Sequence, residues 1–167
     1  MQAPQQIKPT KLADYLEVMT KAVFQSGMSW QVVEAKWAGF REAFAAFDPA
    51  AVAAFTGEDV DRLAEDTRII RNHRKIEATI TNAETILTLD GGSGGFTGWL
   101  RSHPDFDATV AAVRGEFRFL GDTGAYYFLY VVGERVPPHE EWMKAHESTA
   151  HRPSARRPSG SRTARKT

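Results

Sequence analysis

LADYLEVMTKAVFQSGMSWQVVEAKWAGFREAFAAF, residues 12–47, is the stretch that decides the fold class. Within it, apolar residues recur at steps of three and four, which is the spacing of one face of an α-helix. Gln25-Ser26-Gly27 divides the stretch into two helices, and Ser29 is a suitable N-cap for the second. We expect that second helix to run unbroken from Trp30 to Phe47. The two apolar stripes are Leu12, Tyr15, Leu16, Met19 and Val23, then Trp30, Val33, Trp37, Phe40, Phe44 and Phe47.

Helical patterns continue along the chain. Asp48-Pro49 introduces a short helix at 50–55, and Thr56 with Asp59 forms a capping-box pattern for a helix from near Glu58. Residues 126–132 (YYFLYVV) are strand-prone in composition, but a turn and a glycine bound them, and we interpret them as buried helix. We therefore predict an all-α, compact domain of short helices around an aromatic core. Further helices are expected at 76–87, 96–100, 108–113, 124–132 (with Gly133 as C-cap) and 139–146.

Composition excludes several kinds of site. The 167 residues contain no cysteine, which excludes disulfides, thiolate nucleophiles and cysteine-ligated metals. No apolar run is long enough to span a membrane, and residues 1–11 lack the basic start and apolar stretch of a secretory signal. We expect a cytoplasmic monomer that binds no metal and no cofactor.

The zero net charge hides an asymmetry. Residues 148–167 carry six basic residues and no acidic one, which leaves 15 basic and 21 acidic residues in 1–147. The tail is also poor in apolar residues, so we expect it to be disordered. It either attracts polyanions such as nucleic acid or only aids solubility. The expected organisation is a flexible N-terminus at 1–11, a helical domain at 12–147 and a basic tail at 148–167.

Three segments are candidates for function. Trp30, directly after Gln25–Ser29, is either a stacking platform for a base or a core residue. Arg71–Lys75 places cations at a helix start, where the helix dipole disfavours them, so it marks either an external anion or a solvated corner. Phe119–Ala125 is a glycine turn between two helices. It either directs amide groups at a phosphate or is an ordinary corner.

Taken together, these motifs resemble the DNA-3-methyladenine glycosylase I family, within the helix–hairpin–helix base-excision glycosylases. The resemblance extends from about Leu12 to His139. It rests on Gln25-x-Gly27-x-Ser29-Trp30, Phe47-Asp48-Pro49, Asp59-Val60-x-Arg62-Leu63, Ile69-Ile70-Arg71-Asn72, Lys75-Ile76-x-Ala78-x-Ile80-x-Asn82-Ala83 and Phe117-x-Phe119-Leu120-Gly121-x-Thr123-x-x-Tyr126-x-Phe128.

The resemblance implies a base pocket between two lobes and a flipped, alkylated purine in double-stranded DNA as the substrate. Such a base is cationic, so aromatic faces and a carboxylate suit it. The implied base-binding residues are Trp30, Gln25 and Ser29. The implied DNA-backbone-binding residues are Gly121, Thr123, Gly124, Arg71, Asn72 and Lys75.

The chain departs from the family's pattern. Ala22 stands where the family has its pocket glutamate, eight residues before the tryptophan. The family's N-terminal segment is not matched, because the similar region starts near residue 12. Near the C-terminal zinc ligands, His139 is retained but Met143 replaces a cysteine, so we expect no zinc. Phe119 stands where many superfamily members have a glycine.

In the wider superfamily a catalytic aspartate follows the second helix of the helix–hairpin–helix motif. We expect a substitute carboxylate at the same place in this chain. Glu140, followed by Glu141, is the candidate catalytic residue there; the alternative is that both acids only stabilise the start of the last helix. Glu17 is a weaker candidate on another helix face. The expected function is a DNA glycosylase. The alternatives are a catalytically silent DNA-binding descendant and an interaction domain that does not bind DNA.

Overall fold

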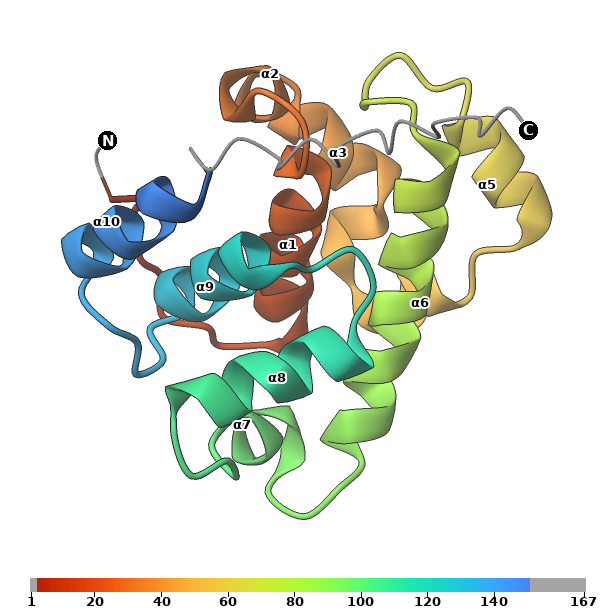
Figure 1. The fold of residues 1–167 in the computed structure, drawn as a ribbon. Coiled ribbons are helices and arrows are strands. Elements are labelled where there is room, and N and C mark those ends of the chain that lie inside the picture. The colour runs from red at the N-terminus through yellow and green to blue at the C-terminus, as the bar shows by residue number, and fades with distance from the viewer. Residues whose placement is uncertain (1–2, 151–167) are drawn as a thin grey trace, which may run out of the picture. The chain divides into compact units, whose positions relative to one another are not determined.

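The computed structural model describes residues 3–150, with side chains through His146, and every regular element in that range is helical (Figure 1). The all-α prediction is confirmed. The described residues divide into two compact units, one that ends at Val136 and one that begins at Pro137. The elements are α1 (Leu12–Gln25), α2 (Trp30–Ala35), α3 (Trp37–Ala43), the 3-10 helix η1 (Ala45–Phe47), α4 (Pro49–Ala53), α5 (Gly57–Leu63), α6 (His73–Asp90), α7 (Gly95–Leu100), α8 (Phe106–Glu116), α9 (Asp122–Val131) and α10 (His139–Ala150).

Helices α1 and α6 organise the first unit. They pack against each other, and both contact α4, while α2 and η1 contact α1 and α5 contacts α6. On the other side α9 packs on α1, α7 packs on α6, and α8 packs on α9 (Figure 1). Two groups of helices, α2–α5 and α7–α9, therefore flank the α1–α6 pair.

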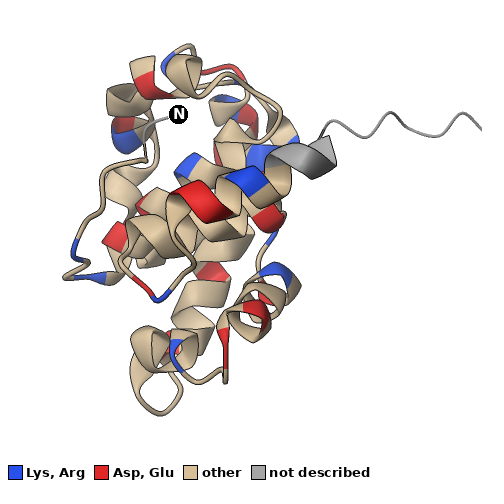
Figure 2. Ribbon diagram, turned by 60° about the vertical axis from the view of Figure 1, so that its left-hand side comes forward, with Lys and Arg blue, Asp and Glu red and all other residues tan. Residues whose placement is uncertain are grey.

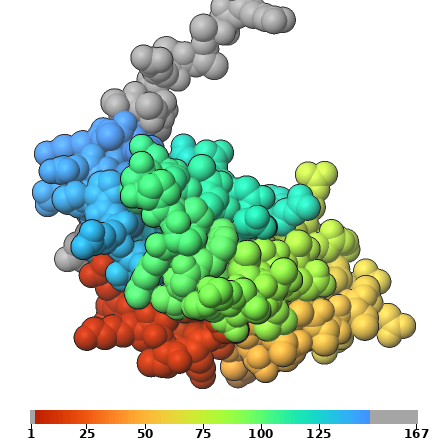
Figure 3. Space-filling model, turned by 90° about the horizontal axis from the view of Figure 1, so that it is seen from below, coloured from red at the N-terminus to blue at the C-terminus, as the bar shows by residue number. Residues whose placement is uncertain are grey.

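Aromatic side chains hold α1 to α7. The Tyr15 and Phe96 rings meet edge to face with centroids 4.9 Å apart, and the Tyr15 hydroxyl lies 3.0 Å from the Thr97 hydroxyl. In Figure 3 the green residues of the α7 region accordingly adjoin red residues near the N-terminus. The aromatic core that the sequence predicts is present, because Phe24, Phe40, Phe44, Phe47, Phe96 and Phe128 are all fully buried.

The prediction of one helix from Trp30 to Phe47 is wrong. The chain leaves helical geometry at Lys36, and Ala45, Ala46 and Phe47 all have positive φ. In a straight helix Phe47 would lie about 15 Å along the axis from Trp37. The breaks instead bring the two rings into a stack with centroids 5.3 Å apart. Burial of both rings offsets the cost of about 1–2 kcal/mol for each left-handed residue.

Several predicted ends are close to those observed. Thr56 and Asp59 form a complete capping box on α5, and Asp48 caps α4. Gly133 follows α9 with a φ of +81°, as a C-cap glycine should. Residues 126–132, the strand-prone segment, lie mostly in α9, and Val132 is its C-cap.

The chain ends differ from the expected organisation. Within the predicted flexible segment 1–11, the Ile7 amide donates to the Val131 carbonyl at 2.8 Å and the Gln6 side chain donates to the Tyr130 carbonyl at 2.9 Å. These bonds tie the segment to the end of α9. Helix α10 extends to Ala150, three residues into the predicted tail, and residues 151–167 lie outside the described part. No helix among the described residues has the length and apolarity to cross a membrane.

Candidate functional site

The three segments singled out in the sequence meet at the C-terminal end of α1. The Lys75 ammonium, in the first turn of α6, donates to the carbonyls of Phe24 at 3.2 Å and Ser26 at 2.5 Å. This contact fixes the Arg71–Lys75 segment against the turn that leads to Trp30. On the other side, α1 packs against α9, the second helix of the hairpin.

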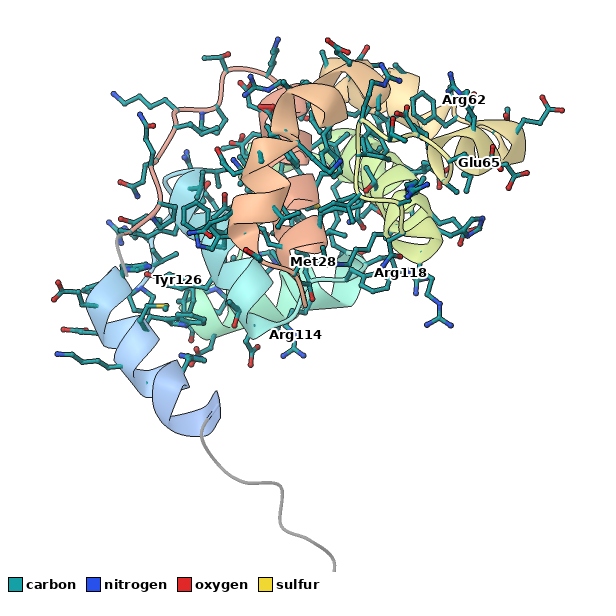
Figure 4. All side chains as sticks on the ribbon, turned by 90° about the horizontal axis from the view of Figure 1, so that it is seen from above. Met28, Arg62, Glu65, Arg114, Arg118 and Tyr126 are labelled. Atoms are coloured by element: carbon teal, nitrogen blue, oxygen red, sulfur yellow. The ribbon has the colours of Figure 1, made fainter. Side chains whose placement is uncertain are left out.

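Trp30 is an exposed indole. It is the first residue of α2, and 52% of its surface is accessible, in contrast to Trp37 in the core. Ser29, its N-cap, is exposed as well and makes no side-chain cap bond. Met28, on the same turn, is also exposed (labelled in Figure 4). The turn between α1 and α2 therefore presents apolar and aromatic surface to solvent, as a stacking platform for a base requires.

The hairpin is held in place by a buried amide. Asn82, on α6, accepts a hydrogen bond from the Arg118 backbone N–H at 2.8 Å and donates one to the Arg118 carbonyl at 3.2 Å. Leu120 is buried, whereas Phe119 is 45% exposed with a φ of +58°. A left-handed phenylalanine is strained, and the clamp on the preceding residue helps to hold this conformation.

The N-terminus of α9 faces solvent. Gly121 is its N-cap, without a side-chain cap bond, and Gly121, Asp122 and Thr123 are exposed. Amide groups at such an end can bind a phosphate. Asp122 places a carboxylate in the same first turn, where it pairs with Arg114 at 2.7 Å across the hairpin. This acid opposes anion binding, and Arg114 offsets its charge.

Gly124 allows α1 and α9 to approach closely. A Cβ at position 124 would lie 3.2 Å from a Leu120 methyl carbon and 3.9 Å from the Ala22 Cβ. Ala22 is itself 4% exposed. The position at which the resemblance would place a pocket glutamate is therefore a small, buried residue between two helices.

Gln25 and Tyr127 join α1 to α9 through their side chains. The Gln25 amide hydrogen-bonds to Tyr127, which lowers the pKa of the phenol. Burial acts more strongly in the opposite direction, and together with the negative charge of Glu34 it raises the pKa of Tyr127 to about 12. The sequence reading missed Tyr127 and Glu34, because neither belongs to a motif.

Exposed arginines lie around these segments. Arg71 and Arg74 near the start of α6, and Arg118 on the hairpin, are exposed. Figure 4 shows Met28 in the same part of the view as Arg114 and Arg118. Asn72 is the N-cap of α6, and its side chain accepts from the Lys75 amide at 3.1 Å.

Lys75 differs from its expected role. Its side chain is only 5% exposed, its ammonium caps the carbonyls at the end of α1, and burial lowers its pKa. An ammonium engaged inside the protein does not reach a phosphate on bound DNA. Lys75 is therefore not part of the proposed DNA interface.

Glu140 and Glu141 belong to the second unit. Both are exposed in the first turn of α10, where carboxylates stabilise the positive end of a helix. In the same helix the Trp142 and His146 rings stack with centroids 3.7 Å apart. Among the described residues, no three His, Asp or Glu side chains are grouped so that they could hold a metal ion.

Comparison with solved structures first defines the class of fold. The chain superposes on a crystal structure of 3-methyladenine DNA glycosylase I with a TM-score of 0.67 at 29% identity, covering 76% of this chain and 81% of that one. The Staphylococcus aureus enzyme gives a TM-score of 0.68 at 23% identity, covering 77% and 80%. The helices described above thus form a 3-methyladenine DNA glycosylase I fold.

Sequence comparison then gives the family. The model of the methyladenine glycosylase family matches residues 9–116, and the chain belongs to that family. DNA-3-methyladenine glycosylase 1 of Escherichia coli strain K12 is 32% identical over 130 residues, which cover 65% of this chain and 70% of the relative. The Haemophilus influenzae DNA-3-methyladenine glycosylase is 28% identical over the same coverage.

Proposed function

We propose that this protein is a DNA glycosylase of base-excision repair that hydrolyses the N-glycosidic bond of an alkylated purine flipped out of double-stranded DNA. The observation that carries the proposal is the meeting of an exposed indole, Trp30, with the start of α6 and the hairpin helix α9 around the end of α1. Membership of the methyladenine glycosylase family supports it.

Cleavage of the glycosidic bond needs little help from a general acid. A 3-alkylated adenine carries a positive charge, so when the bond between the sugar C1′ and the base breaks, the bonding electrons neutralise the base. The sugar becomes an oxocarbenium-like cation, to which water adds with loss of a proton. The protein must mainly bind the flipped base, and stacking on Trp30 with support from Gln25 and Ser29 does this.

We place the DNA backbone against the exposed hairpin and the start of α6. The amides of Gly121, Thr123 and Gly124 are the proposed phosphate donors, and Arg71 and Asn72 are proposed contacts to the neighbouring phosphates. Glu140, followed by Glu141, remains the proposed carboxylate that stabilises the cationic sugar. We propose a monomer acting in the cytoplasm on duplex DNA.

The test is release of 3-methyladenine from methylated duplex DNA. We expect the wild-type protein to release the base, and Trp30→Ala to lower kcat/KM by about 5–100-fold, the range expected for loss of one base-stacking contact. Because Trp30 is exposed, the variant should melt at the wild-type temperature. Glu140→Gln should also lower release. Wild-type protein that releases no base above background would exclude the glycosylase function.

Ala22 favours a second candidate, a DNA-binding descendant without catalysis. The resemblance places a glutamate at this position, and the structure has a buried methyl group in its place. This candidate expects salt-dependent duplex binding that requires the hairpin, with no base release from any alkylated DNA. The release assay therefore separates the two functions directly.

A further inference from the structure

Four polar side chains from three helices form contacts that join α1 to α2 and to α9. Lys21 and Gln25 come from α1, Glu34 from α2 and Tyr127 from α9, and we call them the Glu34 cluster. Lys21 and Glu34 form an ion pair, and Gln25 hydrogen-bonds to Tyr127. Glu34 follows Trp30 by four residues in α2, so the two side chains lie on one face of that helix.

Glu34 is paired with Lys21 on one side and faces solvent on the other. Its side chain is 50% exposed, whereas that of its partner Lys21 is 18% exposed. Lys21 in turn lies over the Trp37 ring, 5.2 Å from its centroid, so it is anchored in the core. Arg41, which is itself paired with Glu17, adds a second positive field near Glu34. Glu34 thus lies among cations while half of its side chain stays accessible.

We propose that Glu34 is the carboxylate that recognises the positively charged base stacked on Trp30. The inference rests on the proposed function and assigns to Glu34 the preference for a purine cation that carries an exocyclic amine. An exposed carboxylate oxygen accepts a hydrogen bond from such an amine and neutralises the ring charge, and the indole face attracts the same cation. A neutral adenine stacks and can donate the same amine hydrogen bond, but it has no ring charge for Glu34 to neutralise.

The test compares two small probes in calorimetric titrations of the full chain. The 3,9-dimethyladeninium ion is a cationic stand-in for the alkylated nucleoside, and 9-methyladenine is its neutral counterpart. Glu34→Gln keeps the shape but removes the charge, so the cation should bind about tenfold more weakly. Binding of the neutral probe should change by less than about twofold. Glu42→Gln is the matched control and should leave both affinities unchanged. It removes an exposed carboxylate of α3 that is paired with Arg68.

A purely structural ion pair gives a different pattern. In that case Glu34→Gln and Lys21→Met lower the melting temperature equally, and Glu34→Gln leaves the preference for the cation over the neutral probe unchanged, which overturns the inference. Base release reports separately on the proposed function. Wild-type protein that releases 3-methyladenine while Glu34→Gln shows unaltered preference refutes only the role of Glu34. Wild-type protein that neither releases the base nor prefers the cation refutes both.

Discussion

Lys75 shows how one residue can fit a functional motif and still serve the fold. Its position among the cations of 71–75 suggests a phosphate contact, but its ammonium is buried on two carbonyls at the end of α1. The carbonyls at a helix C-terminus have no partner within the helix, and a cation there also interacts favourably with the dipole. The sequence could not distinguish these roles, because Lys75 and Phe24 are 51 residues apart along the chain and meet only when it folds.

Replacing Lys75 with methionine separates the two roles. Lys75→Met keeps the length of the side chain but leaves two carbonyl groups without their donor, so we expect the free energy of unfolding to fall by about 1–3 kcal/mol. Urea titration measures this loss. Arg74→Met, an exposed change on the same turn, is the control and should have little effect on stability. Unchanged stability in Lys75→Met, together with weaker DNA binding, would restore the phosphate role.

Tyr127 predicts a pH dependence of stability at alkaline pH. Its pKa is about 12 in the folded protein, against an ordinary value of 10.0. The folded state therefore keeps the proton that the unfolded state has lost, and the stability that this contributes is complete below pH 10 and is lost as the pH rises toward 12. The loss amounts to about 2–3 kcal/mol.

Tyr127→Phe removes this titration. We expect the wild-type protein to lose stability between pH 10 and pH 12 by about 2–3 kcal/mol more than the variant does, measured by urea unfolding at each pH. Phenolate absorbance of the folded protein gives an independent reading, because Tyr127→Phe should remove a late-ionising tyrosine from the titration. Parallel stability curves for the two proteins would show that burial of Tyr127 does not shift its titration.

At the scale of elements, periodicity predicts which residues are buried better than it predicts where helices end. The stripe from Trp37 to Phe47 is buried as expected, yet α3 and η1 replace the single helix. Ala45 and Ala46 are good helix formers, so the local sequence does not predict their left-handed conformation. The stacking of Phe47 on Trp37 decides it, and that is a tertiary effect. By contrast, Thr56 and Asp59 cap α5 through local bonds, which is why their pattern could be read directly.

The Asn82 side chain joins the hairpin to α6. Asn82 is 1% exposed and bonds to both backbone groups of Arg118, so Asn82→Ala removes the partner of a part-buried N–H and C=O. We expect the free energy of unfolding to fall by about 2–3 kcal/mol, and amide hydrogen exchange to quicken at residues 117–121. Thr85→Ala, on the same helix, is the control.

The consequence for function should be specific to the hairpin. If the hairpin binds the DNA backbone, Asn82→Ala should weaken duplex binding at temperatures at which the rest of the protein is folded, whereas Thr85→Ala should not. Faster exchange at the hairpin without any change in duplex affinity would place the DNA contact elsewhere.

At the scale of the whole molecule, charge runs against the usual pattern of a DNA-binding protein. Residues 1–147 hold 21 acidic and 15 basic residues, and Figure 2 shows acidic segments on helices throughout the described ribbon. The motifs were sufficient to predict the family. They could not predict the Glu34 cluster, because Lys21, Glu34 and Tyr127 belong to no motif and meet only when α1, α2 and α9 pack together.

The basic tail is expected to strengthen DNA binding without being needed for base release. All six of its basic residues lie in 151–167, outside the described residues. If they bind phosphates, deleting 151–167 should reduce the slope of log affinity against log salt by up to about five and weaken non-specific binding most at low salt. Base release from a saturating duplex should persist, because the proposed base contacts, the hairpin and Glu140 all precede residue 151. Replacing the six basic residues with glutamine at full length separates charge from tail length. Loss of all binding on deletion would show that the hairpin is no DNA site.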